Sequence, residues 1–71
     1  MARYIVNRTA QYGSNDHEVH NLDAYCNHLP SRENQLALGE HSSCASAVQA
    51  ARRFYSDVNG CYYCANDCHT T

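Results

Sequence analysis

Aromatic and β-branched residues are concentrated near the start of the chain and are followed by alternating polar and apolar positions. Residues 3–8 have the composition of a strand, and residues 17–20 alternate polar and apolar side chains. Between them, residues 12–16 are rich in Gly, Ser, Asn and Asp, which favour turns. These three segments predict an N-terminal β-hairpin.

A break at residues 29–31, which contain Pro30, separates this hairpin from the rest of the chain. Residues 35–38 then predict a third short strand that ends at Gly39.

The strongest helical pattern lies in residues 44–58. Apolar positions recur there with helical spacing, and the segment is rich in alanine. Ser42 or Ser43 is expected to cap the N-terminus. Residues 59–60, Asn-Gly, tolerate left-handed geometry and predict the helix end. The sequence therefore predicts one main α-helix.

Together these elements predict a single small α+β domain over residues 1–71, with a hairpin, a third strand and one helix. A chain of this length buries only about 60% of the surface that it exposes when unfolded, so its core is marginal. Domains of this size usually need further stabilisation from disulfides, a metal ion or oligomerisation.

Five cysteines and five histidines could supply that stabilisation. Residues 1–6 show neither a basic region nor an apolar run of signal-peptide length, so we expect a cytoplasmic protein without membrane association. In the reducing cytosol thiols bind metal or stay free. An odd cysteine count also argues against a fully paired disulfide framework. Metal binding is therefore favoured over disulfides and free thiols.

The formal net charge of −2 argues against a general nucleic-acid binder, because binding to a phosphate backbone needs a basic excess. All five basic side chains are arginines, scattered among seven acidic residues, which favours ordinary surface pairing. We expect a monomeric domain whose macromolecular partner is a protein rather than a nucleic acid.

Residues 60–64, Gly-Cys-Tyr-Tyr-Cys, contain the main chemical motif. Two thiolates in a C-x-x-C turn can bind one metal ion at about 2.3 Å each. Redox motifs share this spacing but start a helix after a buried strand, whereas this motif follows the predicted helix. Cys61 and Cys64 are therefore predicted metal ligands. One of Tyr62 and Tyr63 is expected to pack over the site and the other to stay exposed, unless both complete the core.

A closed zinc site needs two further ligands. His20 and Cys26 lie where the second predicted strand ends and the chain turns, a place that can present both side chains to one point. The predicted set is His20, Cys26, Cys61 and Cys64, with Cys68 or His69 as alternatives to His20. Zinc is the expected ion, although tetrahedral thiolate sites also suit iron.

Three histidines and one cysteine remain outside this set. Cys44 lies on the apolar face of the predicted helix, which favours a small buried hydrophobe, with a disulfide to Cys68 as the alternative. Surface or hydrogen-bonding roles are expected for His17, His28 and His41.

The order of these motifs resembles the Ada-like family of small metal-binding domains, found at the N-terminus of the Ada DNA-repair protein and in relatives appended to nucleases. Such domains have, in order, a hairpin, a ligand pair ending in Cys, an R-x-E-N-like or P-E-N-like segment and a third strand. A short helix with paired alanines and C-x-x-C after a glycine follow. The matching segments here are residues 19–20, Cys26, residues 32–34, residues 36–38, residues 45–51 and residues 60–64.

This resemblance implies that Cys26, Cys61 and Cys64 bind zinc. In the repair protein, a cysteine four residues before the second ligand accepts a methyl group from DNA phosphotriesters. Leu22 occupies that offset here, and His20 is the substitute ligand. Imidazole binds zinc but is not a thiolate alkyl acceptor, so alkyl-transfer repair is not expected.

We therefore expect a non-enzymatic binding or adaptor module with a structural zinc ion. Glu18 and Asp23 flank the predicted ligands and could act as a base, but the chain has no Ser-His-acid order, phosphate-binding glycine loop or nucleotide fingerprint. One alternative is a nucleic-acid contact module that uses Arg3, Arg8, Arg52 and Arg53. The other is a thiol redox or metal-handling protein that uses Cys44, Cys64 and Cys68.

Overall fold

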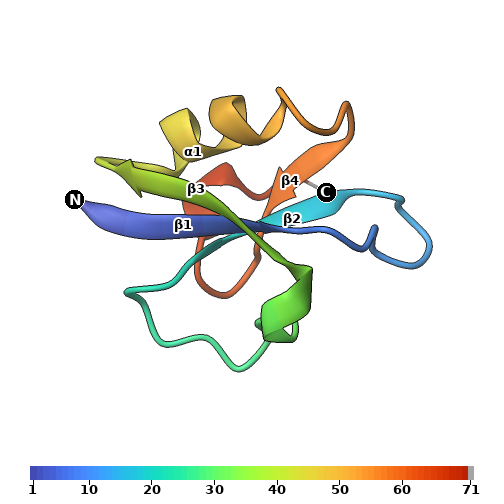
Figure 1. The fold of residues 1–71 in the computed structure, drawn as a ribbon, viewed down its shortest axis with the longest axis horizontal. Helices are drawn as coiled ribbons and strands as arrows, with labels where there is room; N and C mark the ends of the chain where they lie inside the picture. Colours follow the sequence, from blue (N-terminus) through green and yellow to red (C-terminus); the bar gives the residue numbers. More distant parts are fainter. Residues whose placement is uncertain (71) are drawn as a thin grey trace.

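One four-stranded mixed sheet organises the chain in the computed structural model, which describes residues 1–70 (Figure 1). The strand order is β3-β1-β2-β4; β1 runs antiparallel to β2 and β3, and β4 runs parallel to β2. The strands are β1 (Ala2–Asn7), β2 (His17–Asn21), β3 (Gln35–His41) and β4 (Val58–Gly60). The other elements are the helix α1 (Cys44–Ala51) and the 3-10 turns η1 (Arg32–Asn34) and η2 (Asn66–Cys68). The fold class is α+β with one α-helix, as the sequence predicts.

The two faces of the sheet have different coverings. Tyr4 and Val6 of β1 and Val19 of β2 are buried in one cluster with α1. Ile5 and His20 pair directly across the two strands, and both are buried. Because side chains alternate along a strand, this pair points to the face opposite α1. The loop between β2 and η1 passes over that second face (Figure 1).

Strand β3 continues past the predicted end at Gly39 and reaches His41. Gly39 has a φ of +83°, and the register with β1 shifts between Tyr4 and Ile5. A glycine with positive φ lets the strand bulge and resume pairing, so Gly39 marks an irregularity rather than an end.

Helix α1 is shorter than the sequence predicts and ends at Ala51 rather than near Val58. Its buried residues, Ala47, Val48 and Ala51, lie against the sheet, which explains the helical spacing up to that point. Ser43 stands at the N-cap, although its side chain makes no capping hydrogen bond.

The residues after α1 form the fourth strand, which the sequence pattern does not predict. Asn59 and Gly60 were expected to stop the helix, but they pair in parallel with Glu18 and Val19 of β2. A Cβ atom at Gly60 would lie 2.7 Å from the Ala65 carbonyl oxygen, so the glycine allows the following turn to pack closely against β4.

A disulfide joins Cys44, the first residue of α1, to Cys68 at the end of η2. It ties the helix to the C-terminal segment over a sequence separation of 24 residues. No helix within residues 1–70 is long and apolar enough to cross a membrane.

Candidate metal centre

Two parts of the chain that are far apart in sequence deliver four potential metal ligands to one place. His20 comes from β2, Cys26 from the loop after β2, and Cys61 and Cys64 from the turn after β4. The parallel pairing of β2 with β4 explains this convergence. It brings the end of β4 beside β2, where the backbone N–H of Cys61 donates to the Val19 carbonyl at 2.9 Å.

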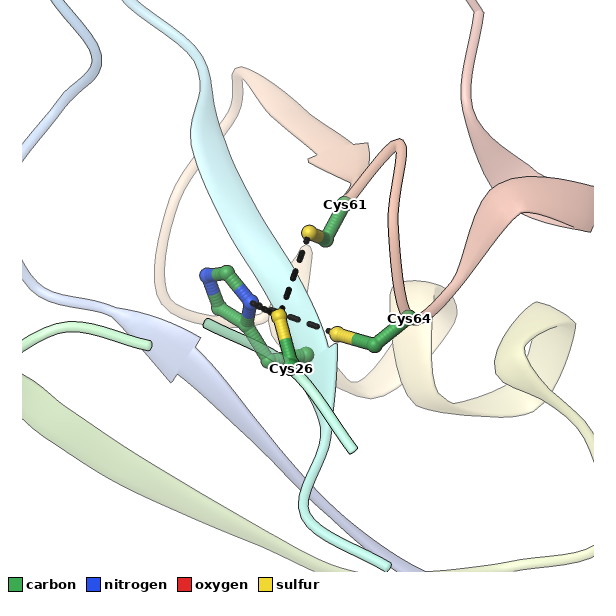
Figure 2. A group of neighbouring side chains, drawn as sticks. Cys26, Cys61 and Cys64 are labelled. Carbon is green, nitrogen blue, oxygen red and sulfur yellow. Dashed lines mark hydrogen bonds between the residues drawn. The ribbon is translucent and has the colours of Figure 1, made fainter. Parts of the chain in front are cut away.

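The four donor atoms all lie within 4.8 Å of one another. The Cys26 Sγ lies 3.9 Å from the Cys61 Sγ and 3.9 Å from the His20 Nδ1, and the Cys64 Sγ lies 3.5 Å from that nitrogen. Figure 2 shows the three labelled thiols pointing toward one another. In a tetrahedral zinc site, two sulfurs lie about 3.8 Å apart, and a sulfur and a nitrogen about 3.5 Å apart. The geometry therefore fits a metal ion bound at this cluster.

Burial gives the imidazole the protonation state that metal binding requires. His20 and Cys61 are each only 1% exposed. Burial, with a smaller effect of His28, lowers the pKa of His20 to about 4. The ring is therefore neutral at pH 7, and with its proton on Nε2 it presents the Nδ1 lone pair to the thiols.

The thiols respond in the opposite way to burial. Burial is the largest effect on Cys61 and Cys64, and it raises the pKa of both. A bound divalent cation would reverse this effect, because it stabilises the thiolate directly. These two thiols are therefore neutral without an ion and would be charged only beside a bound cation.

Glu18 stands behind the imidazole. Its Oε1 lies 3.9 Å from the His20 Nε2, on the side of the ring away from the thiols. Burial raises the pKa of Glu18. A carboxylate near the outer nitrogen of a ligating histidine orients the ring and increases its basicity. The sequence places Glu18 beside the ligands only as a possible base, and this orienting position becomes visible in the fold.

Asp23, the other carboxylate expected near the ligands, is engaged by Arg3. Its Oδ1 accepts from the Arg3 Nη2 at 2.8 Å, and its Oδ2 accepts from the Arg3 backbone at 2.8 Å. These hydrogen bonds lower the pKa of Asp23. The contact also neutralises one of the arginines considered for nucleic-acid binding.

The two alternatives for the fourth ligand, Cys68 and His69, make other contacts in the structure. Cys68 is in the disulfide with Cys44, so it is not available as a thiolate ligand. His69 places its Nδ1 3.0 Å from the Gly60 carbonyl oxygen. The expectation of Cys44 as a simple buried hydrophobe is also wrong, because it is half-buried and disulfide-bonded.

The remaining histidines have packing or hydrogen-bonding roles, as expected. His17 Nδ1 lies 2.8 Å from the Asn7 carbonyl oxygen, and its ring stacks on Tyr55 with centroids 3.7 Å apart. His41 contacts Ser46 Oγ and the Leu38 carbonyl through its two nitrogens.

Tyr62 and Tyr63 lie between Cys61 and Cys64 in the turn after β4, which we call the knuckle. They are 57% and 63% exposed. Neither completes the core, and the expectation that one packs over the site is not met. Tyr63 instead stacks on His28, with ring centroids 3.9 Å apart.

Comparisons of the chain with protein-family models, curated proteins and solved structures find no match. The resemblance to Ada-like domains therefore rests on the sequence motifs alone.

Proposed function

We propose that His20, Cys26, Cys61 and Cys64 bind one structural zinc ion and that the domain acts as a monomeric, non-enzymatic binding module. The observation that carries this proposal is the set of four donor atoms within 4.8 Å of one another. Three thiolates and one imidazole are a usual donor set for structural zinc.

A structural role is favoured over a catalytic one by the number of protein donors. Catalytic zinc sites keep one position for water or substrate, and structural sites fill all four positions from the protein. Here four side chains converge, and two of them are almost fully buried. The ion would join β2, the following loop and the turn after β4, which is where a thin core most needs a cross-link.

Metal analysis of the purified chain tests this proposal. We expect one zinc ion per chain, loss of zinc in Cys26→Ser, and unfolding when a strong chelator removes the metal, because metal binding is coupled to folding in such domains. The matched control is the double variant Cys44→Ser/Cys68→Ser, which removes the disulfide outside the cluster and should keep its zinc. A folded chain that binds no metal, or one that binds iron instead, would contradict the assignment.

We also propose that the domain is related to the Ada-like family in its architecture and not in its chemistry. The support is the motif order, together with Leu22 at the offset where the repair protein has its reactive cysteine and His20 in the cluster as the substitute ligand. Incubation with DNA that carries methyl phosphotriesters should leave the mass of the zinc-loaded chain unchanged. A gain of one methyl group would contradict this view.

The disulfide supports a second candidate function in thiol redox chemistry. Cys44 and Cys68 are paired, while Cys26, Cys61 and Cys64 are free thiols. A redox protein would exchange this bond reversibly, with an external dithiol supplying two electrons and two protons. Thiol counting in redox buffers of increasing reducing strength tests this candidate. A bond that stays oxidised throughout the range of cellular potentials is structural.

A further inference from the structure

Four aromatic rings contact one another around the two tyrosines of the knuckle. Tyr63 stacks on His28 with an interplanar angle of 15°, and Tyr62 stands at 88° to Tyr63 with centroids 5.1 Å apart. His69 adds an edge contact to Tyr62 at 5.4 Å. We call these four rings the aromatic face. Both tyrosines are more than half exposed, so they present much of their surface to solvent.

The aromatic face is held by the backbone of the knuckle. The Ala65 N–H donates to the Cys61 carbonyl at 2.9 Å, and the Asn66 side chain donates to the Tyr62 carbonyl at 3.0 Å. The proposed metal ion would fix the turn at Cys61 and Cys64, on either side of the two tyrosines. Rings held in this way lose little entropy on binding a partner, which favours a contact surface.

A cavity of about 570 Å³ opens beside this face, and it has an acidic character. Tyr63 and Asp67 both line it, and Asp67 is the only charged side chain among its lining residues. Asp67 is exposed, and it forms no ion pair within residues 1–70. The first turn of α1 lines the same cavity and has no side-chain cap, so its amides can donate to carbonyl groups.

The segments that carry the aromatic face hold one unpaired carboxylate, Asp67, because Asp23 is paired with Arg3. Residues 22–31 and 61–70, which carry the rings and the three thiols, contain no arginine or lysine. A zinc ion bound by three thiolates would add a further net negative charge. The arginines lie in other segments, namely Arg3, Arg8, Arg32, Arg52 and Arg53. Exposed rings can stack nucleobases, but these segments carry no arginine or lysine of their own, and Arg3, which contacts them, is already paired with Asp23.

We propose that the aromatic face and the cavity at Asp67 bind an arginine-bearing peptide segment of a partner protein. A guanidinium group can stack on a tyrosine ring and pair with a carboxylate at the same time. Tyr63 and Asp67, on one cavity, offer this combination. The peptide carbonyls are acceptors for the amides of the first turn of α1. The proposal rests on the proposed function, because it identifies the partner of the binding module.

A peptide array of randomised octapeptides tests the chemistry of this site. Each octapeptide is synthesised twice, once with arginine and once with neutral citrulline at its centre, and the array is probed with the zinc-loaded full chain. We expect a subset of peptides to bind, with the arginine form at least about 5-fold tighter than its citrulline twin, as cation–π and ion-pair contacts together would give. Equal binding of the two forms, or no binding, would overturn the proposal.

Paired variants test where on the domain the peptide binds. For the best arginine peptide, Asp67→Asn and Tyr63→Ala should each weaken binding about 2- to 5-fold. Asp57→Asn and Tyr12→Ala remove an exposed carboxylate and an exposed ring outside the two segments, and should change nothing. Tyr63→Phe keeps the ring and should bind as the unaltered chain does. Effects of the control pair equal to those of the test pair would overturn the proposal.

The same variants also test whether a nucleic acid or a second copy of the chain binds at the aromatic face. Tighter binding of a dT12 oligonucleotide than of any peptide, lost in Tyr63→Ala, would identify a nucleic-acid surface and overturn the proposal. A dimer in sedimentation that dissociates in Tyr63→Ala would identify a second copy of the chain as occupant and also overturn it. Zinc content is measured for every variant. Absence of peptide binding at full zinc occupancy contradicts only the peptide proposal. A folded chain that binds peptide without metal contradicts only the zinc proposal.

Discussion

The two ring nitrogens of His20 face different groups. Nδ1 lies 3.5 Å from the Cys64 Sγ, and Nε2 lies 3.9 Å from the Glu18 carboxylate. A ring that is 1% exposed has few ways to turn, so an ion bound at the cluster would meet Nδ1 rather than Nε2. At 3.9 Å from Nε2, the Glu18 carboxylate is too far for a hydrogen bond, and it would act on such an ion through the charge that it places behind the imidazole, as a positioning residue.

We expect Glu18→Gln to weaken zinc binding about 10- to 100-fold while the fold is kept, because partners of ligating histidines commonly contribute this much. Competition with a chromophoric chelator measures the affinity. Glu33→Gln removes an exposed carboxylate in η1 and is the matched control. An unchanged affinity in Glu18→Gln would show that burial alone orients the ring.

The backbone at Gly60 leaves no room for a side chain. A methyl group there would meet the Ala65 carbonyl oxygen at 2.7 Å and the Cys68 Cβ at 2.8 Å, and the first of these atoms is backbone. We expect Gly60→Ala to displace the knuckle, to lower the free energy of unfolding by about 1–3 kcal/mol and to weaken zinc binding. Gly13→Ala, in an open loop with positive φ, should cost about 1 kcal/mol through strain and leave zinc binding unchanged. Equilibrium unfolding and chelator competition measure both effects.

At the scale of elements, the fold depends on the contact between α1 and the sheet. The helix has only eight residues, and isolated helices of this length are not stable in water. Its stability must come from Ala47, Val48 and Ala51, which lie against the sheet, and from the disulfide at Cys44. Small side chains at the contact let the helix approach the sheet closely.

Enlarging one of these alanines tests the closeness of the contact. Ala47 is fully buried, so we expect Ala47→Leu to lower the free energy of unfolding of the zinc-loaded chain by about 1–3 kcal/mol through overpacking. Ala45→Leu makes the same change at an exposed position of the helix and should have an effect below about 0.5 kcal/mol. Denaturant titration separates the two. Equal effects would mean that the contact has room for a larger side chain.

The sequence predicts elements and site residues with local signals and misses those that depend on distant partners. C-x-x-C is a local motif, and His20 and Cys26 lie six residues apart, so both pairs of cluster residues could be identified from the sequence. Strand β4 could not, because Asn59 and Gly60 have poor strand propensity and pair with a segment far away in sequence. The Cys44–Cys68 disulfide is present as the alternative that the sequence offered, but the choice depends on where the chain returns after the knuckle. Tertiary contacts also decide the exposure of Tyr62 and Tyr63, which the spacing leaves open.

At the scale of the whole molecule, one disulfide and the proposed metal site would cross-link a small core. The His/Cys cluster brings residues 20–26 to residues 61–64, and the disulfide joins α1 to η2. They act on different parts of the same C-terminal segment. We therefore expect their contributions to stability to be separable.

Removal of the disulfide in Cys44→Ser/Cys68→Ser should lower the free energy of unfolding by about 3 kcal/mol, as the closure of a loop of this length suggests. The same loss should follow reduction of the unaltered chain with a phosphine that leaves zinc bound. Unfolding is followed by far-ultraviolet circular dichroism, with zinc content measured in parallel. Loss of zinc in the double variant would show that the two cross-links form one cooperative unit.

The presence of one disulfide beside three free thiols also affects how the chain acquires its cysteine pairing. Five thiols in an unfolded chain can form many wrong pairs. A zinc ion that binds Cys26, Cys61 and Cys64 first would act as a protecting group, leaving Cys44 and Cys68 as the only partners for oxidation. Refolding in glutathione buffer with zinc should then give a single disulfide in peptide mapping, and refolding with a chelator should give a mixture. The ion would thus select the correct covalent isomer during folding.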